Sequence, residues 1–142
     1  MSLSPSQAKP ANAAVLPPKN SGVCVNTVNV KSKFELFNDH WSPKIVGELN
    51  GQYVKLTKLK GEFIWHQHDH EDELFLVVKG TLRIMLEDRE LVLQEGDLTI
   101  VPRGVRHKPI ADEEAHVILF EPKSTLTTGA IQNEQTTAGE WI

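Results

Sequence analysis

Short runs of alternating apolar and polar residues, separated by turn residues, dominate the middle of this 142-residue chain. Residues 82–86, 98–100 and 115–120 each follow the two-residue period of a strand, in which successive side chains point to opposite faces. Turn signals recur about every 8–12 residues, and helical periodicity is almost absent. The pattern predicts an all-β domain, a sandwich or a barrel, built from about six to nine strands.

Three further features of the sequence refine this expectation. Val23–Val30 and Phe34–Phe37 are predicted as strands ahead of the central region. Asn50-Gly51 is the strongest short signal for a hairpin turn. Beyond that turn, Gln52–Leu59 mixes aliphatic residues with lysines, which is typical of an edge or half-exposed strand.

Composition divides the chain into three parts. Residues 1–22 are rich in Pro, Ala, Ser and Asn without periodicity, so we expect a flexible N-terminal arm. Residues 23–122 are predicted to form one all-β domain with a single core. Residues 123–142 are polar, and we expect a loosely packed tail that Ile131, Trp141 and Ile142 tie down in places.

Several classes of protein are excluded by composition. The longest apolar run is the five residues Leu74–Val78, far short of the roughly 20 that cross a bilayer. The N-terminal region has no apolar segment of the secretory type, so we expect a soluble, cytoplasmic protein with no membrane partner. The single cysteine, Cys24, excludes an intramolecular disulfide and a thiolate-rich zinc cluster. We expect Cys24 to be a buried strand residue.

Charge is distributed unevenly along the chain. The net charge of −4 disfavours a nucleic-acid partner. Residues 1–60 carry 8 Lys and Arg against 3 Asp and Glu, a net +5, whereas residues 61–142 carry 7 against 16, a net −9. The acidic part also holds five of the six histidines. This imbalance suits a cation site, although acidic loops on a solvated surface produce the same pattern.

Two histidines one residue apart, His66 and His68, mark the most informative stretch. On a strand their rings project from the same face about 6.5 Å apart and can close on one ion where the strand bends. A turn through residues 69–72 would return the carboxylate of Glu73 to that face. His70 forms a second in-phase pair with His68, so the spacing also allows a triad of His68, His70 and Glu73.

A second stretch begins with a sharp turn. Pro102 presets its own φ and Gly104 supplies a permissive one, which places His107 near the start of a strand. If that strand lies beside the first stretch, three histidines and one carboxylate converge.

With these two stretches the sequence resembles the cupin superfamily. The first cupin motif runs Gly, five residues, His-x-His, four residues, Glu, six residues, Gly, and the second runs Gly, five residues, Pro-x-Gly, two residues, His, three residues, Asn. The matching residues here are Gly61, His66, His68, Glu73 and Gly80, then Gly96, Pro102, Gly104 and His107. The chain departs from the pattern twice, because Gly61 is one residue closer to His66 and Ala111 replaces the asparagine.

The resemblance implies a double-stranded β-helix, the jelly-roll barrel of cupins, with one metal ion held by His66, His68, Glu73 and His107. It favours His66 over His70, which we expect to be an exposed loop histidine. Three imidazoles and a carboxylate suit a divalent Fe, Mn, Ni, Cu or Zn ion without distinguishing among them. Small cupins also pair commonly, so we expect a homodimer in which Val23–Phe37 extends the partner's sheet.

Three functions follow from the resemblance. The first is a metalloenzyme, isomerase-like or dioxygenase-like, whose small oxygenated substrate chelates the ion; its general look is that of cupins described as mannose-6-phosphate isomerase-like. The second is a non-catalytic cupin that binds a sugar or another small molecule. The third is a barrel in which the metal has only a structural role.

The remaining polar and aromatic candidates receive plainer interpretations. We expect Asp69, Glu71 and Asp72 to form a solvated turn. Phe63, Trp65 and Phe75 are predicted to pack in the core or an interface. We expect His40-Trp41 to be a structural anchor rather than a pocket wall, and His116 to be satisfied or exposed rather than a general base. Arg103 and Arg106 are expected to be exposed turn residues, with a role facing an anionic substrate as the alternative.

Overall fold

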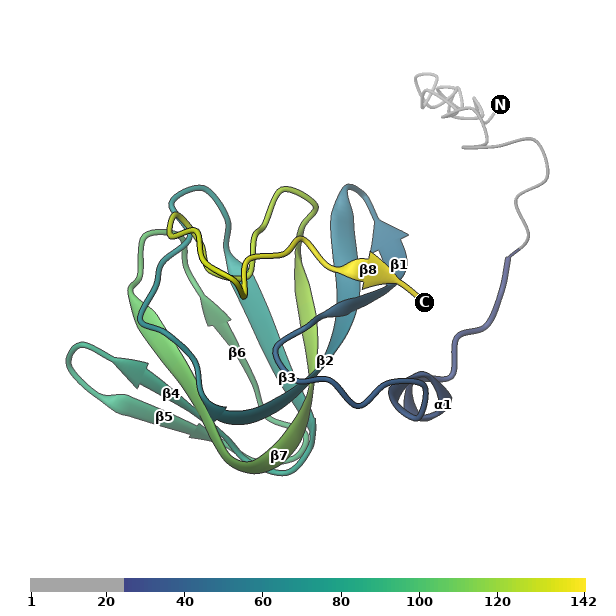
Figure 1. The fold of residues 1–142 in the computed structure, drawn as a ribbon, viewed down its shortest axis with the longest axis horizontal. Coiled ribbons are helices and arrows are strands. Elements are labelled where there is room, and N and C mark those ends of the chain that lie inside the picture. The colour runs from purple at the N-terminus through teal and green to yellow at the C-terminus, as the bar shows by residue number, and fades with distance from the viewer. Residues whose placement is uncertain (1–24) are drawn as a thin grey trace, which may run out of the picture.

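The computed structural model describes residues 25–142, so the predicted N-terminal arm (1–22) and Cys24 lie outside the described residues. One short helix and eight strands make up the described part of the chain (Figure 1). In order they are α1 (Val30–Phe34), β1 (Lys44–Leu49), β2 (Gln52–Glu62), β3 (Glu73–Lys79), β4 (Leu82–Leu86), β5 (Glu90–Leu93), β6 (Leu98–Val101), β7 (His107–Pro122) and β8 (Glu140–Trp141). The all-β expectation is confirmed. Within residues 25–142, no helix has the length and hydropathy needed to cross a membrane.

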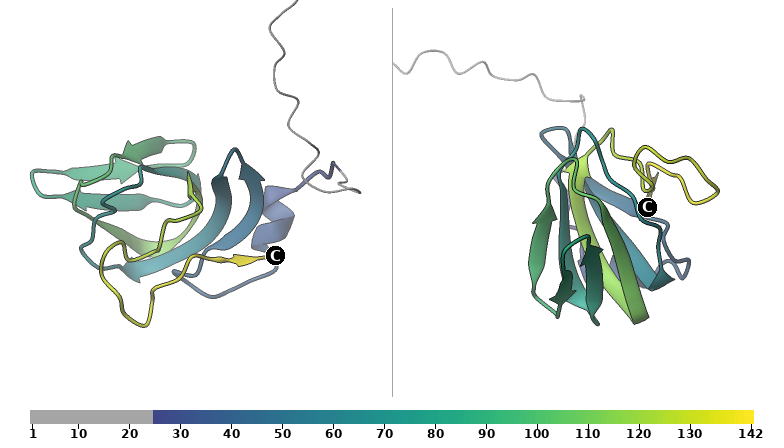
Figure 2. Two further views of the ribbon diagram at one scale, coloured as in Figure 1. Left: turned by 90° about the horizontal axis from the view of Figure 1, so that it is seen from above. Right: turned by 90° about the vertical axis from the view of Figure 1, so that its left-hand side faces the viewer.

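The sheet is organised around β7, which is 16 residues long. The strand order is β5-β4-β7-β2-β1-β8, and β3 pairs with both β7 and β6. Along one edge of β7, residues 110–122 pair with β2, whereas along the other edge residues 107–110 pair with β4 and residues 116–120 pair with β3. The two views of Figure 2 show the sheet curving round on itself so that β2, β3 and β7 face a common interior.

The interior is filled by the inward phase of these strands. On β7, Ala115, Val117 and Leu119 are buried, while the residues between them are half-buried. The core cluster is Leu59, Phe75, Val77, Leu82, Ile84, Leu93, Val101, Ala111, Ala115, Val117 and Leu119. In strand β6 the aliphatic residues Leu98 and Ile100 point to solvent, and Val101 is the buried residue.

The hairpin predicted at Asn50-Gly51 joins β1 to β2. Both residues have positive φ, 51° for Asn50 and 81° for Gly51, as a two-residue turn of type I′ requires. Asn and Gly tolerate that conformation better than other residues, which explains why this pair occupies the turn.

The two strands predicted ahead of β1 are wrong in the described residues. Residues 25–29 have no regular secondary structure, and Val30–Phe34 is the helix α1. The side chain of Asn29 caps α1 by accepting a hydrogen bond from the backbone N–H of Ser32 at 2.8 Å. Phe34 and Phe37 form a second apolar cluster with Leu56, so their spacing of three residues reflects one packed face of a helical turn and not a strand.

Strand β2 is central, so the prediction of an edge or half-exposed strand is also wrong. It lies between β1 and β7, and residues 55–59 are buried on both faces. The two lysines that suggested exposure have buried partners. Lys55 Nζ donates to Glu121 Oε1 at 2.8 Å, and Lys58 Nζ donates to the carbonyl oxygen of Phe37 at 2.6 Å.

The C-terminal segment packs more closely than the sequence predicts. Strand β8 pairs in parallel with β1, and the ammonium of Lys44 joins the carboxylates of Asp39 (2.9 Å) and Glu140 (3.0 Å). Thr125 and Thr128 are fully buried. Gly129 has a φ of 62°, and a Cβ at this position would collide with the carbonyl oxygen of Gln67. The segment therefore lies directly against the loop that carries His66 and His68.

Candidate metal centre

The four residues expected to bind a metal come from three separate parts of the fold. His66 and His68 lie in the loop between β2 and β3, Glu73 is the first residue of β3, and His107 is the first residue of β7. His66 and His107 form an isolated antiparallel bridge, which brings the loop onto the start of β7. The turn through residues 69–72 returns the chain to β3, as the sequence predicted.

The structure brings all four side chains together in the interior. One donor atom from each of His66, His68, Glu73 and His107 lies within 4.8 Å of the others, and all four residues are buried, with exposures of 0–6%. The alternative triad with His70 is not formed, because His70 is exposed in the loop. The cluster could hold one metal ion.

Two of the rings are oriented by backbone carbonyls. His66 Nδ1 lies 2.9 Å from the carbonyl oxygen of Ile64, and His107 Nδ1 lies 2.9 Å from that of Val105. A carbonyl oxygen only accepts hydrogen bonds, so each Nδ1 carries the proton and donates it. In the neutral ring, Nε2 is then left with a free lone pair. Fixing the tautomer in this way is the usual preparation of a histidine for metal binding.

The carboxylate of Glu73 lies close to the rings of His68 and His107. Its Oε2 lies 3.1 Å from His68 Nε2 and 3.3 Å from His107 Nε2. His68 Nε2 is buried and, despite this proximity, is aligned with no hydrogen-bond partner. In neutral His107 the Nε2 lone pair would face a carboxylate oxygen, so this contact calls for a second proton on the ring or for a cation between the two atoms.

The charges at the site follow from burial and proximity. Burial by itself would raise the pKa of Glu73, but the neighbouring rings of His107 and His68 outweigh it and hold that pKa below its ordinary value. Burial, reinforced by the neighbouring His107, lowers the pKa of His66 to about 4. At neutral pH the site therefore offers an ionised carboxylate and a neutral imidazole, which are the forms that bind metals.

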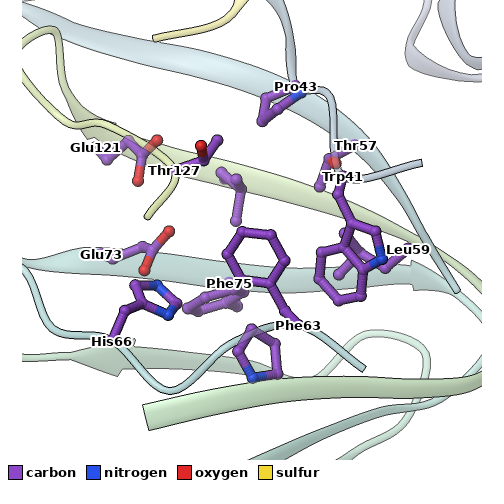
Figure 3. Close-up of a pocket in the computed structure, with 12 residues that line it drawn as sticks. Trp41, Pro43, Thr57, Leu59, Phe63, His66, Glu73, Phe75, Glu121 and Thr127 are labelled. Atoms are coloured by element: carbon purple, nitrogen blue, oxygen red, sulfur yellow. The ribbon is translucent and has the colours of Figure 1, made fainter. Parts of the chain in front are cut away.

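A small cavity of about 30 Å³ lies beside the cluster, with room for a few water-sized groups. His66 and Glu73 form part of its wall, as Figure 3 shows, and Thr127 of the C-terminal segment closes one side. One end is apolar, where Trp41 and Phe63 stack with ring centroids 4.7 Å apart. The full lining is Trp41, Pro43, Thr57, Leu59, Phe63, His66, Glu73, Phe75, Pro109, Leu119, Glu121 and Thr127.

Glu121 is the cavity residue that the sequence interpretation missed. It is 2% exposed and forms an ion pair with the fully buried Lys55, at 2.8 Å. Burial raises the pKa of Glu121 well above its ordinary value, and the negative charge of Glu73 adds to this while Lys55 opposes it. Glu121 shares the inward phase of Ala115, Val117 and Leu119 on β7. A carboxylate among the inward-facing residues of a predicted strand was the sequence signal that could have identified Glu121.

Several other candidates lie away from the cavity. Arg103 contacts Asp72, with Nε 3.4 Å from Oδ1, and Arg106 lies over the ring of Trp65 at 5.1 Å. Neither arginine lines the cavity. Both side chains are exposed, as expected for turn residues, and the anionic-substrate alternative stays a prediction.

The two remaining histidines share one carboxylate on the outer side of β7. His40 Nε2 lies 2.8 Å from Glu114 Oε2, and His116 Nε2 lies 2.9 Å from Glu114 Oε1. His116 also stacks on Phe34, which agrees with a satisfied side chain rather than a general base. Trp41 differs from expectation, because it forms part of the cavity wall.

The donor set fits a divalent transition ion. It combines three imidazoles with one carboxylate, which is a set of intermediate softness. The fixed tautomers of His66 and His107, the ionised carboxylate and the unpartnered Nε2 of His68 leave metal-binding atoms within 4.8 Å of one another. The cavity beside them gives space for a small molecule to reach that point.

Comparisons with known proteins agree with this architecture. The Cupin_2 family, described as a cupin domain, matches residues 53–121. The structure of protein NMB1881 from Neisseria meningitidis is 28% identical, with a TM-score of 0.64, over 68% of this chain and 99% of that one. The uncharacterized protein YdbB of Bacillus subtilis is 39% identical over 64 residues, and the matched part spans 57% of its length.

A crystal structure of a cupin-2 domain containing protein from Shewanella frigidimarina is the strongest of these likenesses. It is 46% identical, with a TM-score of 0.66, and the match covers 67% of this chain and 93% of that one. Identity at this level over nearly the whole of a cupin-2 protein, together with the matched family motifs, shows that the chain belongs to the Cupin_2 family and has the cupin fold.

Proposed function

We propose that this cupin is a metalloenzyme that holds one divalent transition ion through His66, His68, Glu73 and His107 and acts on a small oxygenated substrate. The observation that carries the proposal is the convergence of four buried donor atoms within 4.8 Å beside a cavity. A bound divalent ion would supply Lewis-acid polarisation of a chelating substrate, or a place where O₂ and substrate meet. These two possibilities correspond to isomerase-type and dioxygenase-type chemistry.

The chain's own groups have distinct tasks in this proposal. Backbone carbonyls of Ile64 and Val105 hold two rings in register, so the donor atoms need little rearrangement when an ion binds. Trp41 and Phe63 give the substrate an apolar wall that excludes water. Glu121 can hold a proton inside the cavity, because burial raises its pKa. It replaces His116 as the candidate for proton transfer.

The metal part of the proposal is tested by elemental analysis. Protein purified without a chelating resin is expected to carry one transition ion per chain, and His68→Ala or His107→Ala is expected to lose it. His70→Ala is the matched control, because His70 lies in the same loop but is exposed. Retention of a full equivalent of metal in His107→Ala would show that the ligand assignment is incorrect.

The catalytic part needs a separate experiment. Keto acids, catechols and sugar phosphates are incubated with protein loaded with Fe, Mn, Ni or Zn, and product formation and O₂ uptake are recorded. Turnover that disappears in His107→Ala supports the metalloenzyme. Ligand binding without turnover for every metal favours the second candidate, a non-catalytic cupin that binds a small molecule, for which the partly open cavity beside the cluster is the supporting observation.

A further inference from the structure

Two polar atoms of the cavity wall are buried without a hydrogen-bond partner. They are Oε2 of Glu121, in a residue 2% exposed, and Oγ1 of Thr57, in a residue 1% exposed. Both residues line the same cavity as His66 and Glu73. A buried polar group left unpaired is destabilising, so such groups in a folded interior call for an explanation.

The surroundings of Glu121 explain why its Oε2 has no hydrogen-bond partner. Lys55 satisfies only Oε1, at 2.8 Å, and both partners of this pair are almost completely buried. Figure 3 shows the carboxylate of Glu121 on the same side of the cavity as that of Glu73, with Thr57 farther along the wall near Trp41. The carboxyl group of Glu121 therefore lies on the Glu73 side of the cavity wall, where the Glu73 carboxylate acts on it.

The chemistry of these atoms selects the group that would satisfy them. When Glu121 is ionised, Lys55 balances its charge, so this corner of the cavity then does not call for a charged ligand group. A hydroxyl group can both donate and accept a hydrogen bond, and it therefore suits a carboxyl oxygen in either protonation state as well as a threonine hydroxyl. At about 30 Å³ the cavity has room for only a few non-hydrogen atoms, so it suits the hydroxyl-bearing end of a small ligand.

We propose that Glu121 and Thr57 form a hydroxyl-binding subsite, so that the natural ligand is a small hydroxy acid or hydroxycarbonyl compound with at least one hydroxyl beyond the pair that chelates the metal. This inference rests on the proposed function, because the chelating end of the ligand needs the ion. Glu121 is the specificity-determining residue, and Thr57 extends the subsite for ligands with one more hydroxyl.

Two probes differ by the hydroxyl in question. Lactate and glycerate both chelate a metal through the carboxylate and the α-hydroxyl, but only glycerate carries a further hydroxyl. Binding of each to protein reconstituted with Zn²⁺ is measured by isothermal titration calorimetry. We expect glycerate to bind at least about tenfold more tightly than lactate, because only glycerate satisfies the buried oxygen of Glu121.

The decisive variant removes the whole ion pair. Glu121→Gln alone would leave Lys55 buried without its counter-charge, whereas Lys55→Met with Glu121→Leu replaces the pair by apolar groups of similar size, which proteins often tolerate. This double variant is expected to bind the two acids about equally. The matched control, Lys123→Met with Glu48→Leu, removes an ion pair of the same 2.8 Å length outside the cavity and should keep the glycerate preference.

A second, isosteric substitution covers the case in which the double variant does not fold. Thr57→Val is expected to weaken binding of threonate, which has one more hydroxyl than glycerate, about fivefold or more. Thr125→Val is its control, because Thr125 Oγ1 is also buried and unpartnered but does not line the cavity. This control should bind threonate like the unmodified protein.

The outcomes separate this inference from the proposed function. Equal binding of lactate and glycerate by the unmodified protein overturns the subsite and leaves the metal site standing. An unchanged glycerate preference in the folded double variant also overturns it, as does unchanged threonate binding in Thr57→Val if the double variant does not fold. Failure of the unmodified protein to retain Zn²⁺ overturns the proposed function, and the subsite with it.

Discussion

His66 and His107 donate backbone hydrogen bonds to each other's carbonyl oxygens, at 3.0 Å from His66 N to His107 O and 2.9 Å in the other direction. This pair of bonds joins a loop to the first residue of the longest strand. Two of the four donor side chains are therefore placed by the backbone of the fold, and their rings are then oriented by Ile64 and Val105. Such a site would need little rearrangement to bind a metal ion.

Metal removal is therefore expected to lower stability without unfolding the barrel. A ligand present at 100 times its Kd stabilises the native state by about 2.7 kcal/mol, so a chelator should lower the Tm by several degrees while the far-ultraviolet circular dichroism stays β-type. In His66→Ala the chelator should no longer change the Tm, whereas in His70→Ala it should lower the Tm as in the unmodified protein. A chelator-induced loss of the β-type spectrum at room temperature would contradict a preformed site.

The stability of the metal-free protein is expected to depend on pH between about 4 and 6.5. The pKa of His66 is lowered from 6.5 to about 4 by burial and by His107, so over this range the unfolded chain binds more protons and stability is lost as pH falls. The shift corresponds to about 3 kcal/mol at most, at roughly 1.4 kcal/mol per pKa unit. The lowered pKa of Glu73 acts with the same sign below its ordinary value of 4.5.

Urea unfolding at a series of pH values measures this dependence. His66→Ala should flatten the profile between pH 6.5 and 4, because the buried imidazole that resists protonation is gone. His70→Ala should leave the profile unchanged, since His70 is exposed. An equally steep profile in His66→Ala would assign the pH dependence to other groups.

Gly129→Ala is expected to displace the C-terminal segment from the site. The new Cβ would collide with the carbonyl oxygen of Gln67, and the φ of 62° is itself unfavourable for alanine. We expect a loss of stability of about 2 kcal/mol and faster proteolysis within residues 123–142. Gly51→Ala is the matched control, because Gly51 has a φ of 81° with no atom near its Cβ position. Equal effects of the two substitutions would show that strain in φ alone is responsible.

The homodimer stays a prediction, but the residues expected to form its interface change. Residues 25–37 contain a helix and not the strand that was to extend the partner's sheet. Val92, Leu98 and Ile100 are more than half exposed on β5 and β6, and these are the apolar side chains that we now expect a second copy to cover. Sedimentation at micromolar concentration should give twice the mass of one chain, and Ile100→Lys should reduce it. A monomer mass for the unmodified protein contradicts the prediction.

The sequence predicted the local parts of this molecule well, because each depends on neighbouring residues. The two-residue alternation in 115–120 specifies a strand, and Asn50-Gly51 specifies its turn whatever surrounds it. The spacing of His66, His68 and Glu73 reflects the turn between them. The resemblance to cupins then supplied His107, whose distance along the chain no local pattern could bridge.

The features that depend on contacts between distant parts of the chain were decided only by the tertiary structure. Lys55 and Lys58 suggested an exposed strand, but their partners lie on β7 and in the loop after α1, so burial could not be foreseen from β2 alone. Glu121 became a cavity residue because β7 pairs with both β2 and β3. A short apolar segment such as 30–37 has no strong local preference, and its helix is chosen by packing against Leu56.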